Sequence, residues 1–363
     1  MKKTSLLVMG FLTLSALLVF AYAAGGDASD PLASLSYLNG SFSSMVDTRV
    51  TQKLDASDAA LLENGTLSDT ADSSTSTWTE IRLKASDMLT GSTGTNVLVL
   101  AGSVQVSFSS GAVVDVTTGT AISSGSILTA NHRYLVAEDT SAVFTVLSKT
   151  AVVDYQGPYG FSYSDSTDYN AMAAALKTMH LFKGSFTGYG KGYDLEVSPT
   201  RLQALIMFIR VLGEEDAALS WSGSSPFTDV AAGTQAAQYV GYAYERGYTN
   251  GFSATTFRPA QTITANQYME FMLRALGYSS TSNTDLSDTL SRAVNAGVIT
   301  SKEQELLRSE VFLRADLVYI SYYALDSLVA GTSETLRDTL LIKGVFTTSE
   351  SASAQAMVTS IRK

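Results

Sequence analysis

The chain has 363 residues, of which 45% are hydrophobic and 16% charged, a composition typical of a globular protein and not of a disordered or fibrous one. The length suffices for two or three compact domains. The sequence has no cysteine, which excludes disulfides, a thiol nucleophile and a thiolate metal site, and also lipidation at an N-terminal cysteine.

The formal net charge of −10 is unevenly distributed along the chain. Residues 24–168 contain 6 Lys and Arg against 16 Asp and Glu, whereas residues 169–363 contain 16 against 18. A general attraction to nucleic acid or to anionic lipid is therefore not expected. Any anionic ligand would have to be bound by particular arginines.

Residues 1–23 have the pattern of a secretory signal peptide. Lys2 and Lys3 precede an apolar run at 6–20, and the small-residue motif Ala21-Tyr22-Ala23 follows at the position of a cleavage site. The alternative is an uncleaved membrane anchor, because residues 6–24 are barely long enough to span a bilayer. We expect cleavage, and hence a secreted protein without a membrane segment.

Residues 24–76 are predicted to be a helical segment and a linker. Apolar residues recur at roughly helical spacing within residues 43–62, and a Ser/Thr/Asp-rich stretch follows at 68–76. Residues 77–160 are predicted to form a small all-β domain, an antiparallel barrel or sandwich, because short Val, Thr and Phe-rich runs alternate with glycines. The predicted strands are residues 96–100, 104–108, 112–116, 134–136 and 143–146.

Residues 165–345 are predicted to be all-α and to contain an internal repeat. The segments at 200–213, 264–277 and 313–326 align without gaps, and each follows a shorter helix that ends in glycine. The three copies cover about 165–218, 226–278 and 286–327. We separate residues 346–363 as a C-terminal tail, and whether the final segment closes the domain or reaches a partner stays open.

The middle copy carries three short motifs in order. Phe-Thr-Asp-Val occupies 227–230, Gly-Tyr-Thr-Asn-Gly occupies 247–251 and Thr-Phe-Arg-Pro occupies 256–259, directly before a helix start. This arrangement resembles the S-layer homology (SLH) family. The resemblance implies that three repeats build one pseudo-threefold helical domain. It also implies that grooves between repeats bind an anionic, pyruvylated secondary cell-wall polysaccharide attached to peptidoglycan.

The first residues of the repeated helices have two kinds of predicted role: the capping pair stabilises the helix, and the arginine after the cap binds a ligand. Thr200 with Gln203, and the equivalent pair at 264 and 267, are predicted to form capping boxes, which stabilise a helix start. An arginine directly after the cap opposes the helix dipole, at a cost of a few tenths to about 1 kcal/mol. An anionic ligand would explain it, because a guanidinium at a helix N-terminus makes a strong carboxylate site.

Arg201 and Arg314 occupy this position, whereas the middle copy has Ala265. We therefore predict two polysaccharide-binding arginines and one silent groove. An ordinary surface charge is the alternative for both arginines.

Arg258 and Asp229 are further candidate binding residues. Arg258 matches a family position near the groove, although it would equally serve as a turn residue against Asp229. Asp229 is expected to cap the first helix of the middle copy. His132 and His180 have no neighbours at metal-ligand spacing and no nucleophile elbow accompanies them, so we predict no catalytic residue, metal or cofactor.

The leading interpretation is a noncatalytic, secreted cell-surface protein that is anchored noncovalently to wall polysaccharide and peptidoglycan. One alternative is a structural envelope protein that binds other proteins and whose repeats keep only the fold. A wall-glycan-acting enzyme is a further alternative, because a glycosidase needs only two carboxylates. Nucleic acid is not expected as a partner, and neither is a membrane after signal cleavage.

Overall fold

The structure is a computed structural model, and it describes residues 44, 46, 48–49, 73–184, 194–278 and 286–363. The chain divides into Met1–Ala71 and Asp72–Lys363. The predicted signal peptide lies outside the described residues. So does most of the helix predicted within 43–62, of which only Ser44, Val46, Thr48 and Arg49 are described, and these four are helical.

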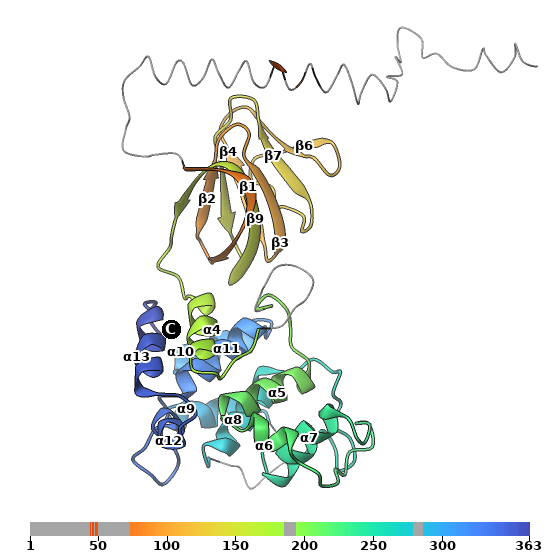
Figure 1. The fold of residues 1–363 in the computed structure, drawn as a ribbon, viewed down its shortest axis with the longest axis vertical. Helices are drawn as coiled ribbons and strands as arrows, with labels where there is room; N and C mark the ends of the chain where they lie inside the picture. Colours follow the sequence, from red (N-terminus) through yellow and green to blue (C-terminus); the bar gives the residue numbers. More distant parts are fainter. Residues whose placement is uncertain (1–43, 45, 47, 50–72, 185–193, 279–285) are drawn as a thin grey trace, which may run out of the picture. The chain divides into compact units, whose positions relative to one another are not determined.

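From residue 73 onward the chain first forms an antiparallel β-sheet (Figure 1). Its strands are β1 (Ser73–Lys84), β2 (Met88–Gly91), β3 (Asn96–Ala101), β4 (Val104–Phe108), β5 (Ala112–Asp115), β6 (Thr120–Ile122), β7 (Arg133–Ala137), β8 (Ala142–Val146) and β9 (Thr150–Ser162). The strand order is β4-β8-β2-β9-β3-β7-β5-β6, and β1 also pairs with β9. The sheet curls into a half-barrel, so the predicted antiparallel β architecture is confirmed.

Alternating side chains fill the inside of this half-barrel. Val104 and Val106 of β4 are fully buried, whereas Gln105 between them is half-buried and Ser107 is exposed. This alternation follows from the strand geometry, which points successive side chains to opposite faces. Phe144 of β8 and Val153 of β9 lie in the same apolar cluster.

Two boundaries of the predicted β domain are wrong. The predicted linker at 68–76 overlaps β1, which begins at Ser73 and pairs with Tyr159. The predicted end at residue 160 is also too early, because β9 continues through Pro158 to Ser162. The length of β9 explains both errors, since its backbone pairs with residues 73–75. A proline is tolerated near an irregular end of a strand, and here the register of β1 against β9 shifts after Thr75.

The chain beyond the sheet is helical (Figure 1). The helices are α4 (Tyr169–Thr178), α5 (Arg201–Val211), α6 (Glu215–Leu219), α7 (Gln235–Glu245), α8 (Ala265–Ala275), α9 (Thr289–Asn295), α10 (Ser301–Ser309), α11 (Arg314–Ala324), α12 (Leu336–Ile342) and α13 (Thr348–Met357).

The three aligned segments form helices α5, α8 and α11, and each of these contacts the other two. Phe208 of α5, Met272 of α8 and Val318 of α11 are fully buried in one apolar cluster. The central position of these helices follows from sequences that are apolar on most sides.

The predicted capping boxes are confirmed at α5 and α8. Thr200 Oγ1 accepts from Gln203 N at 3.2 Å, and Gln203 Oε1 accepts from Thr200 N at 3.0 Å. The same two bonds are present at the start of α8. At α11 only the return bond exists, from Leu313 N to Asp316 Oδ2, because leucine has no side-chain acceptor.

The segment at 346–363, which we separated as a tail, packs into the helical core instead. Helix α13 lies against α4, and both Phe346 and Ala354 are buried. Arg362 donates from Nε to the buried carboxylate of Glu303 at 2.8 Å. The sequence hid this role because the segment is rich in small and polar residues, and only a few of them face the core.

Within the described part of the chain, no helix is long and apolar enough to cross a membrane.

Candidate anion-binding site

Arg201 is the first residue of α5, and its side chain reaches the extended segment before α8. Its backbone N–H donates to Gln261 O at 2.8 Å, and the next residue, Leu202, donates to Pro259 O at 3.1 Å. The guanidinium lies 4.8 Å from the ring centre of Phe257, and its Nε donates to the Phe257 carbonyl at 2.8 Å. The side chain is thus fixed by an aromatic face and a backbone carbonyl.

The electrostatic environment of Arg201 is unusual for a cation. Only 3% of the residue is exposed. Burial, and then the positive charge of Arg258, lower the pKa of Arg201 to about 10, against the opposing effect of Asp229. The guanidinium therefore keeps its charge at pH 7 although its surroundings disfavour it.

Among the described residues, nothing accepts a hydrogen bond from the Nη donors of Arg201. Among the described residues no carboxylate forms an ion pair with Arg201, and the hydrogen bond to Phe257 O uses only Nε. An arginine has five N–H donors, and a carboxylate accepts two of them side by side.

Arg258 supplies a second cation beside Arg201. Its guanidinium lies 3.5 Å from the ring centre of Phe252, and Nη1 is 3.5 Å from Gln261 Oε1. The residue is exposed and has a φ of +60°, a conformation that is uncommon for a residue with a side chain. Phe252, itself 44% exposed, was not predicted, because nothing in the sequence indicates which aromatic ring lies under Arg258.

Asp229 fixes the backbone that carries Arg258. Its carboxylate accepts from Phe257 N at 2.8 Å and from Arg258 N at 2.7 Å. Burial alone would raise the pKa of Asp229, but these N–H donors bring it below its usual value. The predicted capping role of Asp229 is wrong, because Thr234 caps α7, whereas Asp229 holds the turn at residues 257–258.

The structure gives the other two helix starts different surroundings. Arg314, the first residue of α11, is 7% exposed and its Nη1 lies 3.1 Å from Asp194 Oδ2. Ala265, the first residue of α8, is 6% exposed and belongs to the apolar core. Arg201, Arg258 and Asp229 therefore lie together, whereas Arg314 lies apart from them, paired with a carboxylate that the sequence analysis did not single out.

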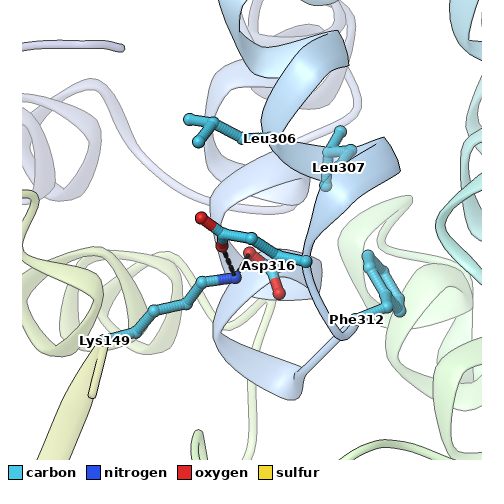
Figure 2. Close-up of a pocket in the computed structure, with 6 residues that line it drawn as sticks. Lys149, Leu306, Leu307, Phe312 and Asp316 are labelled. Atoms are coloured by element: carbon cyan, nitrogen blue, oxygen red, sulfur yellow. Dashed lines mark hydrogen bonds and ion pairs between the residues drawn. The ribbon is translucent and has the colours of Figure 1, made fainter. Parts of the chain in front are cut away.

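A small cleft elsewhere in the molecule is already filled by a charged side chain. Figure 2 shows Lys149 pointing toward Asp316, beside Leu306, Leu307 and Phe312. Lys149 Nζ lies 2.6 Å from Asp316 Oδ1 and 2.7 Å from Glu310 Oε2. The ion pairs account for the charges in this cleft, so it offers no better ligand site than the start of α5.

Comparison with known proteins gives a family match within the helical part. The S-layer homology domain family model matches residues 226–264, which include Asp229, Arg258 and the segment that contacts Arg201. Residues 226–264 thus match the S-layer homology domain, the family that the motifs of the middle copy resemble.

Two curated relatives are cell-envelope proteins. A middle cell wall protein of Brevibacillus brevis is 27% identical over 164 residues, which cover 42% of this chain and 16% of the relative. A surface layer protein of Brevibacillus choshinensis is 29% identical over 125 residues, covering 33% of this chain and 11% of the relative. The matches therefore span only a small part of each relative's length. The family and these relatives indicate a location at the cell surface.

Proposed function

We propose that the chain is a noncatalytic surface protein, held to the cell wall by an anionic polysaccharide that binds at the start of α5. The ligand group would be a carboxylate, such as a pyruvyl ketal on a secondary wall polymer. Arg201 would bind it with the Nη donors that are left over, and Arg258 would add a second positive charge at the rim. Asp229 would act indirectly, by holding the turn that carries Arg258.

The single observation that carries this proposal is the buried, charged guanidinium of Arg201 without a carboxylate partner among the described residues. Burying an unpaired cation is costly, and a fold rarely keeps one without a compensating interaction. The neighbouring Arg258 increases the cost because it repels Arg201. An incoming carboxylate would offset both the cost of burying Arg201 and the repulsion by Arg258, and the guanidinium would bind it bidentately.

The three helices α5, α8 and α11 would then be three degenerate S-layer homology repeats around one axis. Their shared start positions and mutual contacts support this interpretation. A protein-binding role without sugar recognition is the second candidate, and it is favoured by the loss of the cation at Ala265.

Binding to purified wall sacculi tests the proposal, with and without removal of the secondary polymer. We expect the full chain to sediment with intact sacculi and to stay soluble with stripped ones. Arg201→Gln and Arg258→Gln should each reduce binding at least tenfold, which corresponds to a loss of about 1.4 kcal/mol or more.

Lys302→Gln is the matched control, because it removes one positive charge from an exposed position on α10. The circular dichroism spectrum of each variant should match that of the parent. Equal binding to both kinds of sacculi, or full binding by Arg201→Gln, would refute the polysaccharide site and leave the protein-binding role. Release of soluble sugar from the sacculi would show an enzyme.

A further inference from the structure

The start of α11 is held in the same way as the start of α5. Arg314 N donates to Val197 O at 2.9 Å, and Ala315 N donates to Leu195 O at 3.0 Å. The first two residues of α5 donate in the same way to Gln261 and Pro259. In both cases the two acceptor carbonyls are two residues apart, and the first residue of the helix donates to the later one. The two helix starts are therefore equivalent in backbone geometry, and their side chains can be compared position by position.

In the segment that meets the start of α11, Asp194 occupies the position that Arg258 occupies in the segment that meets the start of α5. Each of these residues directly precedes the first acceptor of its segment, and each has a positive φ, +51° for Asp194 and +60° for Arg258. Arg201 therefore meets a second cation at this position, whereas Arg314 meets an anion. The carboxylate of Asp194 bonds the Arg314 guanidinium at 3.1 Å.

The Arg314 pair is as enclosed as Arg201. Asp194 is 1% exposed and Arg314 is 7% exposed, against 3% for Arg201. Of the two buried guanidiniums at these helix starts, that of Arg314 is bonded to a carboxylate of the protein itself, whereas that of Arg201 is bonded to no carboxylate among the described residues.

We propose that Asp194 is an internal substitute for the ligand carboxylate, which closes the second anion site at Arg314 and leaves one ligand per chain. This inference rests on the proposed function of Arg201. The ligand class for the closed site is the same, a saccharide that carries a carboxylate. Removing the charge of Asp194 would open the site, because the Arg314 guanidinium would lose this ion pair and an external carboxylate could then replace it.

The stoichiometry of binding tests the proposal, measured by isothermal titration with a methyl glycoside that carries a 4,6-pyruvyl ketal. Asp194→Asn is the informative variant, because asparagine keeps the shape of the side chain and tolerates a positive φ. We expect one site in the parent and two in Asp194→Asn. Arg201→Gln should abolish binding, and Arg201→Gln combined with Asp194→Asn should bind one equivalent.

Each failure has a distinct pattern. If the parent binds one equivalent and Asp194→Asn also binds one, the closed site is refuted and the proposed function stands. If the parent binds two equivalents, the closed site is refuted as well. Absence of binding by the parent refutes the proposed function, and the closed site survives only if the double variant binds.

Arg314→Gln keeps the proposal testable if Asp194→Asn does not fold. Because the Arg314 guanidinium is already paired with Asp194, this variant should bind the glycoside with the parent's affinity, within twofold. A tenfold loss would show that Arg314 contacts the ligand in the parent and would overturn the inference.

Discussion

Lys149 joins the turn between β8 and β9 to the start of α11, through ion pairs with Asp316 and Glu310. Lys149→Met removes the ammonium group and keeps the apolar stem in place. Breaking a fully buried ion pair costs about 3–5 kcal/mol. The side chain of Lys149 is 17% exposed and that of Glu310 is 38% exposed, so water weakens these pairs, and we expect a loss of about 1–3 kcal/mol at pH 7.

The loss should depend on pH through Asp316. Burial raises the pKa of Asp316, and Lys149 is the largest influence that lowers it, so the variant should have a still higher pKa. A carboxyl group with a raised pKa stabilises the fold below the unfolded value of about 3.9, and this stability is lost as the pH rises through the folded value. The deficit of Lys149→Met should therefore be large at pH 7 and should shrink toward pH 4, where Asp316 takes up a proton.

Equilibrium urea unfolding at pH 7 and pH 4 measures both effects. The two tryptophans allow the parts to be followed separately, because Trp78 lies in β1 and Trp221 lies between α6 and α7. Each would be recorded after replacing the other with phenylalanine. Lys302→Met is the control. A deficit below about 0.5 kcal/mol, or one that is equal at the two pH values, would refute the assigned role of Lys149.

Three further predictions concern the helical part. Thr264→Ala should lower the free energy of unfolding by about 0.5–2 kcal/mol, because it removes the cap of α8. Gly251→Ala should destabilise by at least 1 kcal/mol more than Gly233→Ala in urea unfolding, since both have positive φ but only the Gly251 Cβ would collide with Phe227, at 2.2 Å; equal losses would contradict this account. Glu215→Gln should destabilise at pH 7 by about 1–3 kcal/mol and by much less near pH 2. Burial would raise the pKa of Glu215, but three side-chain hydrogen bonds lower it to about 2. The contribution of Glu215 to stability is therefore present above the unfolded pKa and is lost as the pH falls. A loss that does not depend on pH would contradict this prediction.

The sequence predicted those parts of the fold that depend on local patterns. Helix starts at Thr200 and Thr264 followed from capping residues. The strands predicted at 96–100 and 104–108 followed from short β-rich runs between glycines. Strand β1 and the packing of residues 346–363 were not predictable, because each depends on a partner that lies far along the chain.

The candidate site shows the same limit. Arg201 and Arg314 occupy the same position of the aligned segments, directly after the cap position of a similar helix. What separates them is the residue that another segment brings to the guanidinium, Arg258 in one case and Asp194 in the other. The gapless alignment already places Asp194 at the position of Arg258, so this signal was available, but its meaning required knowing that the segment meets a different helix.

The proposed single open anion site would limit the strength of anchoring. One carboxylate bound per chain gives little affinity by itself, because multivalent gain requires two sites that engage one polymer at the same time. We therefore expect the parent to bind the isolated glycoside and the repeating polymer with similar affinity per carboxylate. Asp194→Asn should bind the polymer at least tenfold more tightly than the parent, while its sites bind the glycoside no more tightly than the parent site. Surface plasmon resonance with immobilised polymer at low density would measure this, and an equal gain on glycoside and polymer would indicate a better single site in place of a second one.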